Sequence, residues 1–193
     1  MALNLIAQDN YSMRVVHGTA TQYNLGEIVS GDFGAYKHNL TVTSVDGGYL
    51  LKNGLGSLPI DLYAKSGVSY YNEGDYKNAY GLDLYIKALW NVDFLENRVR
   101  VGFGEGVSYT TRLLQTELMD AAKQDGHTSK FLNYLDISVD FDFGRLIRNK
   151  ALRDTYIGFV IKHRSGIFGL INNVKHGGSN YNSFYIEKNF VIL

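Results

Sequence analysis

The sequence contains no cysteine, so it can form neither disulfide bonds nor thiolate metal sites. It has one proline among its 193 residues. No stretch approaches the roughly 18 consecutive apolar residues that a membrane-spanning helix needs. Lysine plus arginine equal aspartate plus glutamate at 19 each, so there is no basic excess to bind nucleic-acid phosphates. We therefore expect no spanning helix and no nucleic-acid partner.

Aromatic residues and glycine are abundant instead. The chain has 15 Tyr, 10 Phe and 21 Gly, a composition typical of many strands joined by glycine-containing turns. Its length suits one domain, so we expect a single all-β domain over 1–193.

Eight segments have the composition and alternation of β-strands. They are 11–19, 38–52, 58–71, 79–92, 97–110, 131–143, 154–167 and 180–192. In the sixth, Leu135, Ile137 and Val139 lie on one face, and Asp136 and Asp140 on the other. Both signs of charge occur on the polar faces, so these groups could pair inside a narrow barrel whose apolar face meets lipid. The opposite assignment, with the apolar face inward, describes a soluble lipid-binding barrel or a sandwich.

The connections between these segments differ in length at the two ends. If odd strands run up, the upper connections are about 19–37, 72–78, 111–130 and 168–179, and most lower ones are short. Outer-membrane barrels show this asymmetry. The sequence therefore favours an eight-stranded antiparallel transmembrane β-barrel. Residues 113–123 have helix-forming composition, which predicts a short helix on the barrel's outer rim or capping its loop.

His163 and Ser165 continue the apolar face of the seventh strand. Ile157, Phe159 and Ile161 precede them at alternate positions, so the five side chains point to the same side. A histidine beside a serine can act as the base that takes the serine's proton. The alternative interpretation is a polar pair at the rim of an ordinary strand.

The last third of the chain resembles the PagL-type lipid A 3-O-deacylases. The resemblance lies in His163-Arg-Ser-Gly166, in the glycine- and asparagine-containing loop 167–178, and in Ser179-Asn-Tyr181 leading into the last strand. It extends more loosely over 58–193. The resemblance implies an eight-stranded barrel in the outer membrane of a Gram-negative bacterium. It also implies a serine esterase that removes an ester-linked hydroxyacyl chain from lipid A.

The resemblance further implies roles for individual residues. Ser165 would be the nucleophile and His163 the general base. The family orients this histidine with a carboxylate, but the matching residue in this chain is Asn180. An amide oxygen can hold an imidazole tautomer, although it cannot stabilise an imidazolium by charge. Glu105 is another acid, on the apolar side of the fifth strand, but this strand is not adjacent to the seventh.

An ester hydrolase also needs donors for the oxyanion. The resemblance suggests the backbone N–H after the serine, at Gly166 or Ile167, together with an asparagine of the following loop. Asn173, or its neighbour Asn172, is the candidate asparagine, although His176 aligns nearest the family's position.

The partners implied are lipopolysaccharide with its lipid A and the outer-membrane lipid. No cofactor is implied, and no histidine spacing predicts a metal site. The sequence leaves open a homodimer. A non-catalytic outer-membrane barrel, serving structure or adhesion, is the main alternative function, and a soluble lipid-binding barrel is the other.

Overall fold

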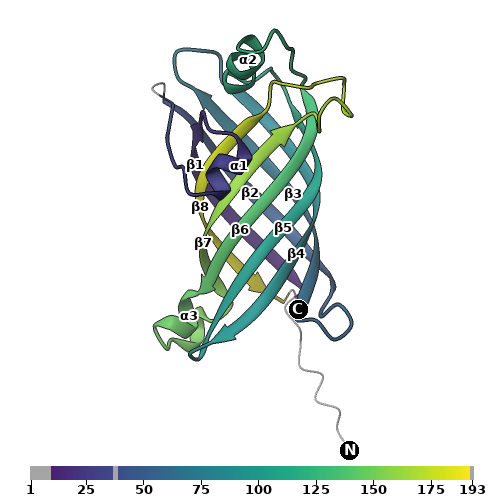
Figure 1. Cartoon of the computed structure of the whole chain (residues 1–193). Coiled ribbons are helices and arrows are strands. Elements are labelled where there is room, and N and C mark those ends of the chain that lie inside the picture. The colour runs from purple at the N-terminus through teal and green to yellow at the C-terminus, as the bar shows by residue number, and fades with distance from the viewer. Residues whose placement is uncertain (1–9, 37–38, 192–193) are drawn as a thin grey trace, which may run out of the picture.

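The computed structural model describes residues 10–36 and 39–191, which form one closed barrel (Figure 1). Each strand pairs antiparallel with the next, and the last pairs with the first. The strands are β1 (Tyr11–Thr21), β2 (Leu40–Lys52), β3 (Ile60–Glu73), β4 (Ala79–Phe94), β5 (Asn97–Thr110), β6 (Phe131–Asp142), β7 (Thr155–Ser165) and β8 (Ser179–Phe190). All eight predicted strands are confirmed, with ends that differ by no more than two residues. Residues 38 and 192 of the predicted strands lie outside the described residues.

The inside of the barrel is charged and filled. Asp136 lies at its centre, where it accepts hydrogen bonds of 2.6 Å from both Arg14 and Lys87. All three side chains are buried. Lys87 belongs to β4, and the outward-facing residues of this strand, such as Leu84 and Ile86, are about half exposed. The apolar face therefore points outward, and the apolar-inward alternatives, including the soluble lipid-binding barrel, are wrong.

An apolar outer surface around a charged interior is the arrangement of a transmembrane barrel. A soluble protein rarely exposes a continuous apolar surface of this extent. Inside, acidic and basic side chains form ion pairs across the barrel, such as Lys65 with Glu187 and Arg100 with Asp140. The alternation seen in the sequence thus has its physical cause in lipid outside and ion pairs inside.

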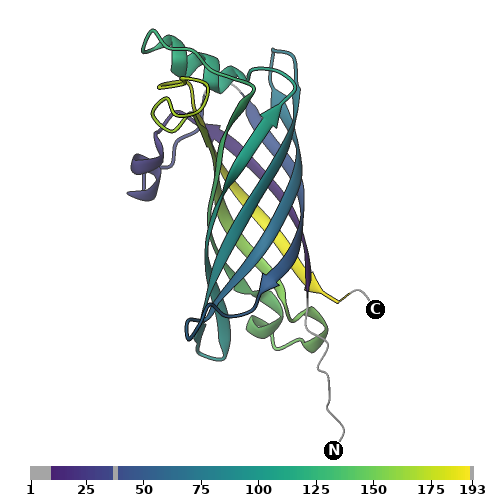
Figure 2. The same cartoon turned by 90° about the vertical axis from the view of Figure 1, so that its right-hand side faces the viewer.

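The long connection between β6 and β7 lies at one end, here called the lower end. The other long connections lie at the opposite, upper end. They contain α1 (Leu25–Val29) and α2 (Gln115–Ala122), and α3 (Phe143–Leu146) and the 3-10 helix η1 (Lys150–Leu152) lie at the lower end. None of the helices in the described part of the chain is long and apolar enough to cross a membrane. Figure 2 shows that the segments with α1, α2 and residues 166–178 gather on one side of the upper end.

Helix α2 packs against one side of the upper end of the barrel. Its Glu117 is buried and accepts hydrogen bonds from Arg164 at 2.7 Å and from Ser179 at 2.9 Å. Burial raises the pKa of the Glu117 carboxyl, and the Arg164 guanidinium opposes this rise. The helix predicted within 113–123 is thus confirmed. Because the buried Arg164 donates to Glu117, it ties the upper end of β7 to this helix.

Candidate active site

His163 and Ser165 lie at the upper end of β7 on the outer surface of the barrel wall. Both are half-buried, whereas Arg164 between them is buried inside. Across the neighbouring strands, His163 pairs with Asn180 of β8 and Ser165 pairs with Asn133 of β6. The structure therefore places the two predicted residues on one face, as period two requires.

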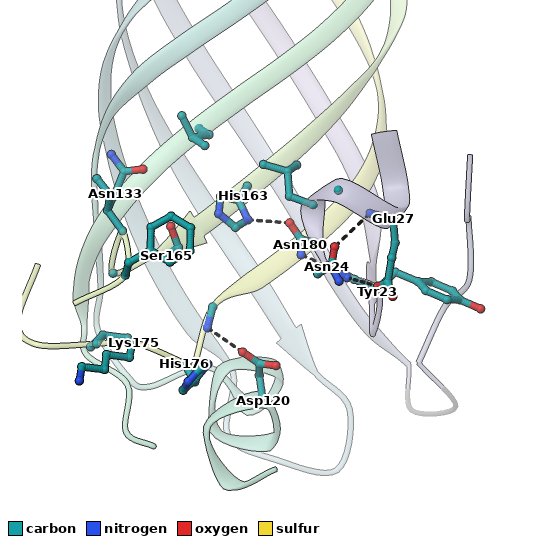
Figure 3. Close-up of a pocket in the computed structure, with 18 of the residues that line it drawn as sticks. Tyr23, Asn24, Glu27, Asp120, Asn133, His163, Ser165, Lys175, His176 and Asn180 are labelled. Atoms are coloured by element: carbon teal, nitrogen blue, oxygen red, sulfur yellow. Dashed lines mark hydrogen bonds between the residues drawn. The ribbon is translucent and has the colours of Figure 1, made fainter. Parts of the chain in front are cut away.

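Asn180 orients the histidine ring (Figure 3). Its Oδ1 lies 2.7 Å from Nδ1 of His163, and its Nδ2 donates to the backbone oxygen of Tyr23 at 3.0 Å. Because a carbonyl needs a donor opposite it, the Tyr23 contact fixes the amide nitrogen on that side and turns Oδ1 toward the ring. Nδ1 must then carry the proton, which leaves Nε2 as the basic nitrogen.

The Tyr23 carbonyl is held in place by the start of α1. Asn24 caps this helix by accepting from the Glu27 backbone N–H at 3.0 Å, and Glu27 accepts from the Asn24 backbone N–H at 2.7 Å. The segment that contains α1 returns to the barrel at Tyr36, whose backbone N–H donates to the Ala20 carbonyl at 3.2 Å. This part of the site was not predicted from the sequence, although the Asn-x-x-Glu spacing is a recognisable helix start.

A cleft of about 760 Å³ surrounds the pair. It lies outside the barrel wall, beneath the three upper segments seen in Figure 2. Residues from all three line it, and so do outward-facing residues of β5, β6, β7 and β8. His163, Ser165, Gly166 and Asn180 are among them. The described residues contain no group of three or more side chains that could hold a metal ion.

The chain turns sharply directly after Ser165. Ile167 and Phe168 both have left-handed backbone conformations, with φ of 48° and 54°. Their backbone N–H groups reach no acceptor within the described part of the chain. A Cβ added to Gly166 would lie 2.0 Å from the Val174 carbonyl oxygen, so this position requires glycine. The turn therefore leaves two unengaged donors close to the serine.

The loop asparagines do not join these donors. Asn172 donates to the Phe131 carbonyl at 2.8 Å and to Ser129 Oγ at 3.0 Å, which ties the loop to the start of β6. Asn173 is exposed and lies outside the residues that line the cleft. The expected contribution of Asn173 to an oxyanion site is therefore not supported by its position. His176 does line the cleft.

Two further polar residues line the cleft on the side away from Asn180. Asn133, which the sequence analysis did not single out, faces Ser165, and its Nδ2 donates to Glu105 Oε1 at 2.5 Å. No hydrogen bond joins Ser165 to His163 in the described structure, nor does Glu105 contact the histidine ring by one. Glu105 was considered from the sequence as an alternative acid, because it is a charge on an otherwise apolar strand face.

No protein-family model matches the chain, and no curated protein matches it. The solved structures with a similar fold include two outer-membrane proteins. The outer membrane enzyme PagL matches over 93% of this chain and 99% of its own, with a TM-score of 0.63 and 11% identity. Neisserial surface protein A (NspA) matches over 95% of this chain and 98% of its own, with a TM-score of 0.54 and 10% identity. Likeness at such identities shows the barrel fold and leaves the activity undecided.

Proposed function

We propose that the chain is a lipid A 3-O-deacylase, a serine esterase in the outer membrane of a Gram-negative bacterium. The observation that carries this proposal is the hydrogen bond from His163 Nδ1 to Asn180 Oδ1, beside Ser165 in one cleft. The similarity of fold to the outer membrane enzyme PagL supports it. The proposed partners are lipopolysaccharide and the surrounding outer-membrane lipid.

The chemistry follows from the tautomer of the histidine. With Nδ1 protonated, Nε2 of His163 takes the proton of Ser165 as its oxygen attacks the ester carbonyl. The imidazolium then returns that proton to the departing sugar oxygen, which leaves an acyl-serine. A water molecule, activated by the same nitrogen, hydrolyses this intermediate. Asn180 keeps the ring oriented without adding a charge, so the imidazolium gains less stabilisation than a carboxylate would give.

The turn after Ser165 supplies the oxyanion site in this proposal. The developing negative charge on the carbonyl oxygen is stabilised by backbone donors that already point at it. The unengaged N–H groups of Ile167 and Phe168 are suited to this role, because they lie two and three residues after the nucleophile in the turn. Gly166 acts by allowing the turn to pack against Val174.

The position of the cleft suits a substrate held in a membrane. It opens on the outer wall, so an acyl chain can enter from the side without leaving the lipid. Two of the segments that line the cleft carry exposed apolar residues. They are Val29 at the end of α1, Phe33 beyond it, and Phe168 and Leu170 in the loop after β7. Such side chains are stable when they contact acyl chains and costly in water.

The direct test is mass spectrometry of lipopolysaccharide incubated with the detergent-solubilised barrel. The proposal predicts the loss of one hydroxyacyl mass from lipid A and the appearance of the free hydroxy fatty acid. The second candidate function is a non-catalytic barrel, which is favoured by the missing hydrogen bond between Ser165 and His163. Unchanged lipid A in the presence of folded protein would support this second candidate.

A further inference from the structure

Glu105 is the one carboxylate at the outward-facing positions of the described strands. It is exposed on β5, and Phe103 and Val107 lie on either side of it on the same face. Its partner on the neighbouring strand β4 is the exposed Ile86. A charge on the lipid-facing surface destabilises a membrane barrel, and the cost is smallest near the interfaces. A charge kept at such a place points to a function.

The carboxylate is joined to the residue that faces the nucleophile. Glu105 Oε1 accepts from Nδ2 of buried Asn133 at 2.5 Å, and the same nitrogen donates to the Gly106 carbonyl at 3.0 Å. Both acceptors hold the amide nitrogen, so the amide cannot turn around. Asn133 Oδ1 and the second oxygen of Glu105 receive no hydrogen bond from the described residues. Two acceptors in the cleft are therefore available to a ligand.

These acceptors lie next to Ser165, where the ester would bind, but they take no part in the proton transfer from Ser165 to His163. Asn133 and Ser165 are directly opposite on paired strands, where Cβ atoms are about 5 Å apart. Asn180 lies on the other side of the pair, on β8. An ester bound at Ser165 would thus have the histidine and Asn180 on one side, and Asn133 with Glu105 on the other.

We propose that Glu105 and Asn133 form a subsite that accepts a hydrogen bond from a hydroxyl group of the lipid next to the scissile ester. The inference depends on the proposed esterase function. A carboxylate and an amide oxygen need a donor, and they would repel a phosphate. Two hydroxyls fit this chemistry: the one on the acyl chain close to its carbonyl, and one on the sugar ring beside the ester oxygen. A site built for a hydroxyl discriminates strongly against the analogue that lacks it.

The test uses three synthetic glycolipid esters with the same chain length. One carries both hydroxyls, one lacks the acyl hydroxyl, and one lacks the sugar hydroxyl. We expect the complete ester to have a kcat/KM about tenfold above that of at least one analogue, because a hydrogen bond to a charged group is lost. Glu105→Gln should reduce this ratio and Glu105→Leu should bring it close to one. The analogue that shows the effect identifies the hydroxyl.

Glu96→Gln is the matched control. Glu96 is exposed in the turn between β4 and β5 at the lower end, and it is not among the residues that line the cleft. This variant should keep the wild-type ratio. Equal kcat/KM values for all three esters with the wild-type protein would overturn the subsite and leave the esterase intact, as would an unchanged ratio in Glu105→Leu. Hydrolysis of none of the esters would overturn the proposed function itself.

Discussion

Asn180 turns its carbonyl oxygen toward His163 because its amide nitrogen donates to the Tyr23 carbonyl. A residue on β8 and a backbone group before α1 thus decide together which ring nitrogen is basic. An asparagine in place of a carboxylate is compatible with a histidine base for this reason. The orientation of an amide in such a site is as important as its presence, since the opposite orientation would favour the wrong tautomer.

Asn180→Ala should lower kcat for lipid A by about a hundredfold, because the ring loses the partner that fixes its tautomer. Asn182→Ala is the control, because Asn182 lies two residues further along the same face of β8, pairs with Ile161 and forms no hydrogen bond with His163. Initial rates at several substrate concentrations would separate kcat from KM. Equal rates for wild-type protein and Asn180→Ala would show that Asn180 does not orient a catalytic base.

Gly166→Ala should lower kcat by about a hundredfold, because small displacements of reacting groups have effects of this size. The added Cβ would lie 2.0 Å from the Val174 carbonyl, so the turn that follows Ser165 must move. Gly47→Ala is the control, because nothing lies within 4 Å of its added Cβ. Circular dichroism would verify that both variants keep the barrel. Normal activity in Gly166→Ala would argue against an oxyanion site in this turn.

Val15→Arg tests whether the outer surface meets lipid. Val15 lies in the middle of β1, where its partners Val45 and Ile186 are also exposed and apolar. In bilayers the variant should lose about 2–4 kcal/mol of unfolding free energy. Tyr80→Arg, at the upper end of β4, should lose about 1 kcal/mol or less. Reversible urea unfolding in vesicles measures both. Equal small losses would mean that the middle of this wall is not in hydrocarbon.

The barrel could be predicted from the sequence because its signal is local. Each strand repeats every two residues, so Asp136 and Leu135 could be assigned to opposite faces without any knowledge of the fold. Which face was inside could not be decided by periodicity. The structure decides it through Arg14 and Lys87, which come from other strands to neutralise Asp136.

The candidate site could be predicted only in part. His163 and Ser165 share a strand. The alternation of side chains along β8 predicts that Asn180 lies on the same outer face. The Tyr23 carbonyl could not be predicted, because a loop's return to the barrel depends on tertiary contacts and has no period. Asn133 was missed for a similar reason, since only the register of β6 with β7 places it opposite Ser165.

The most direct measurement of the central claim is mass spectrometry of lipid A after incubation with wild-type protein, Ser165→Ala, His163→Ala and the control Ser66→Ala. Ser66 is an exposed, outward-facing serine on β3, a strand that contributes no residue to the cleft. We predict that wild-type protein and Ser66→Ala remove one hydroxyacyl chain, and that Ser165→Ala and His163→Ala leave lipid A intact. Deacylation by Ser165→Ala at the wild-type rate, or no deacylation by folded wild-type protein, would contradict the account.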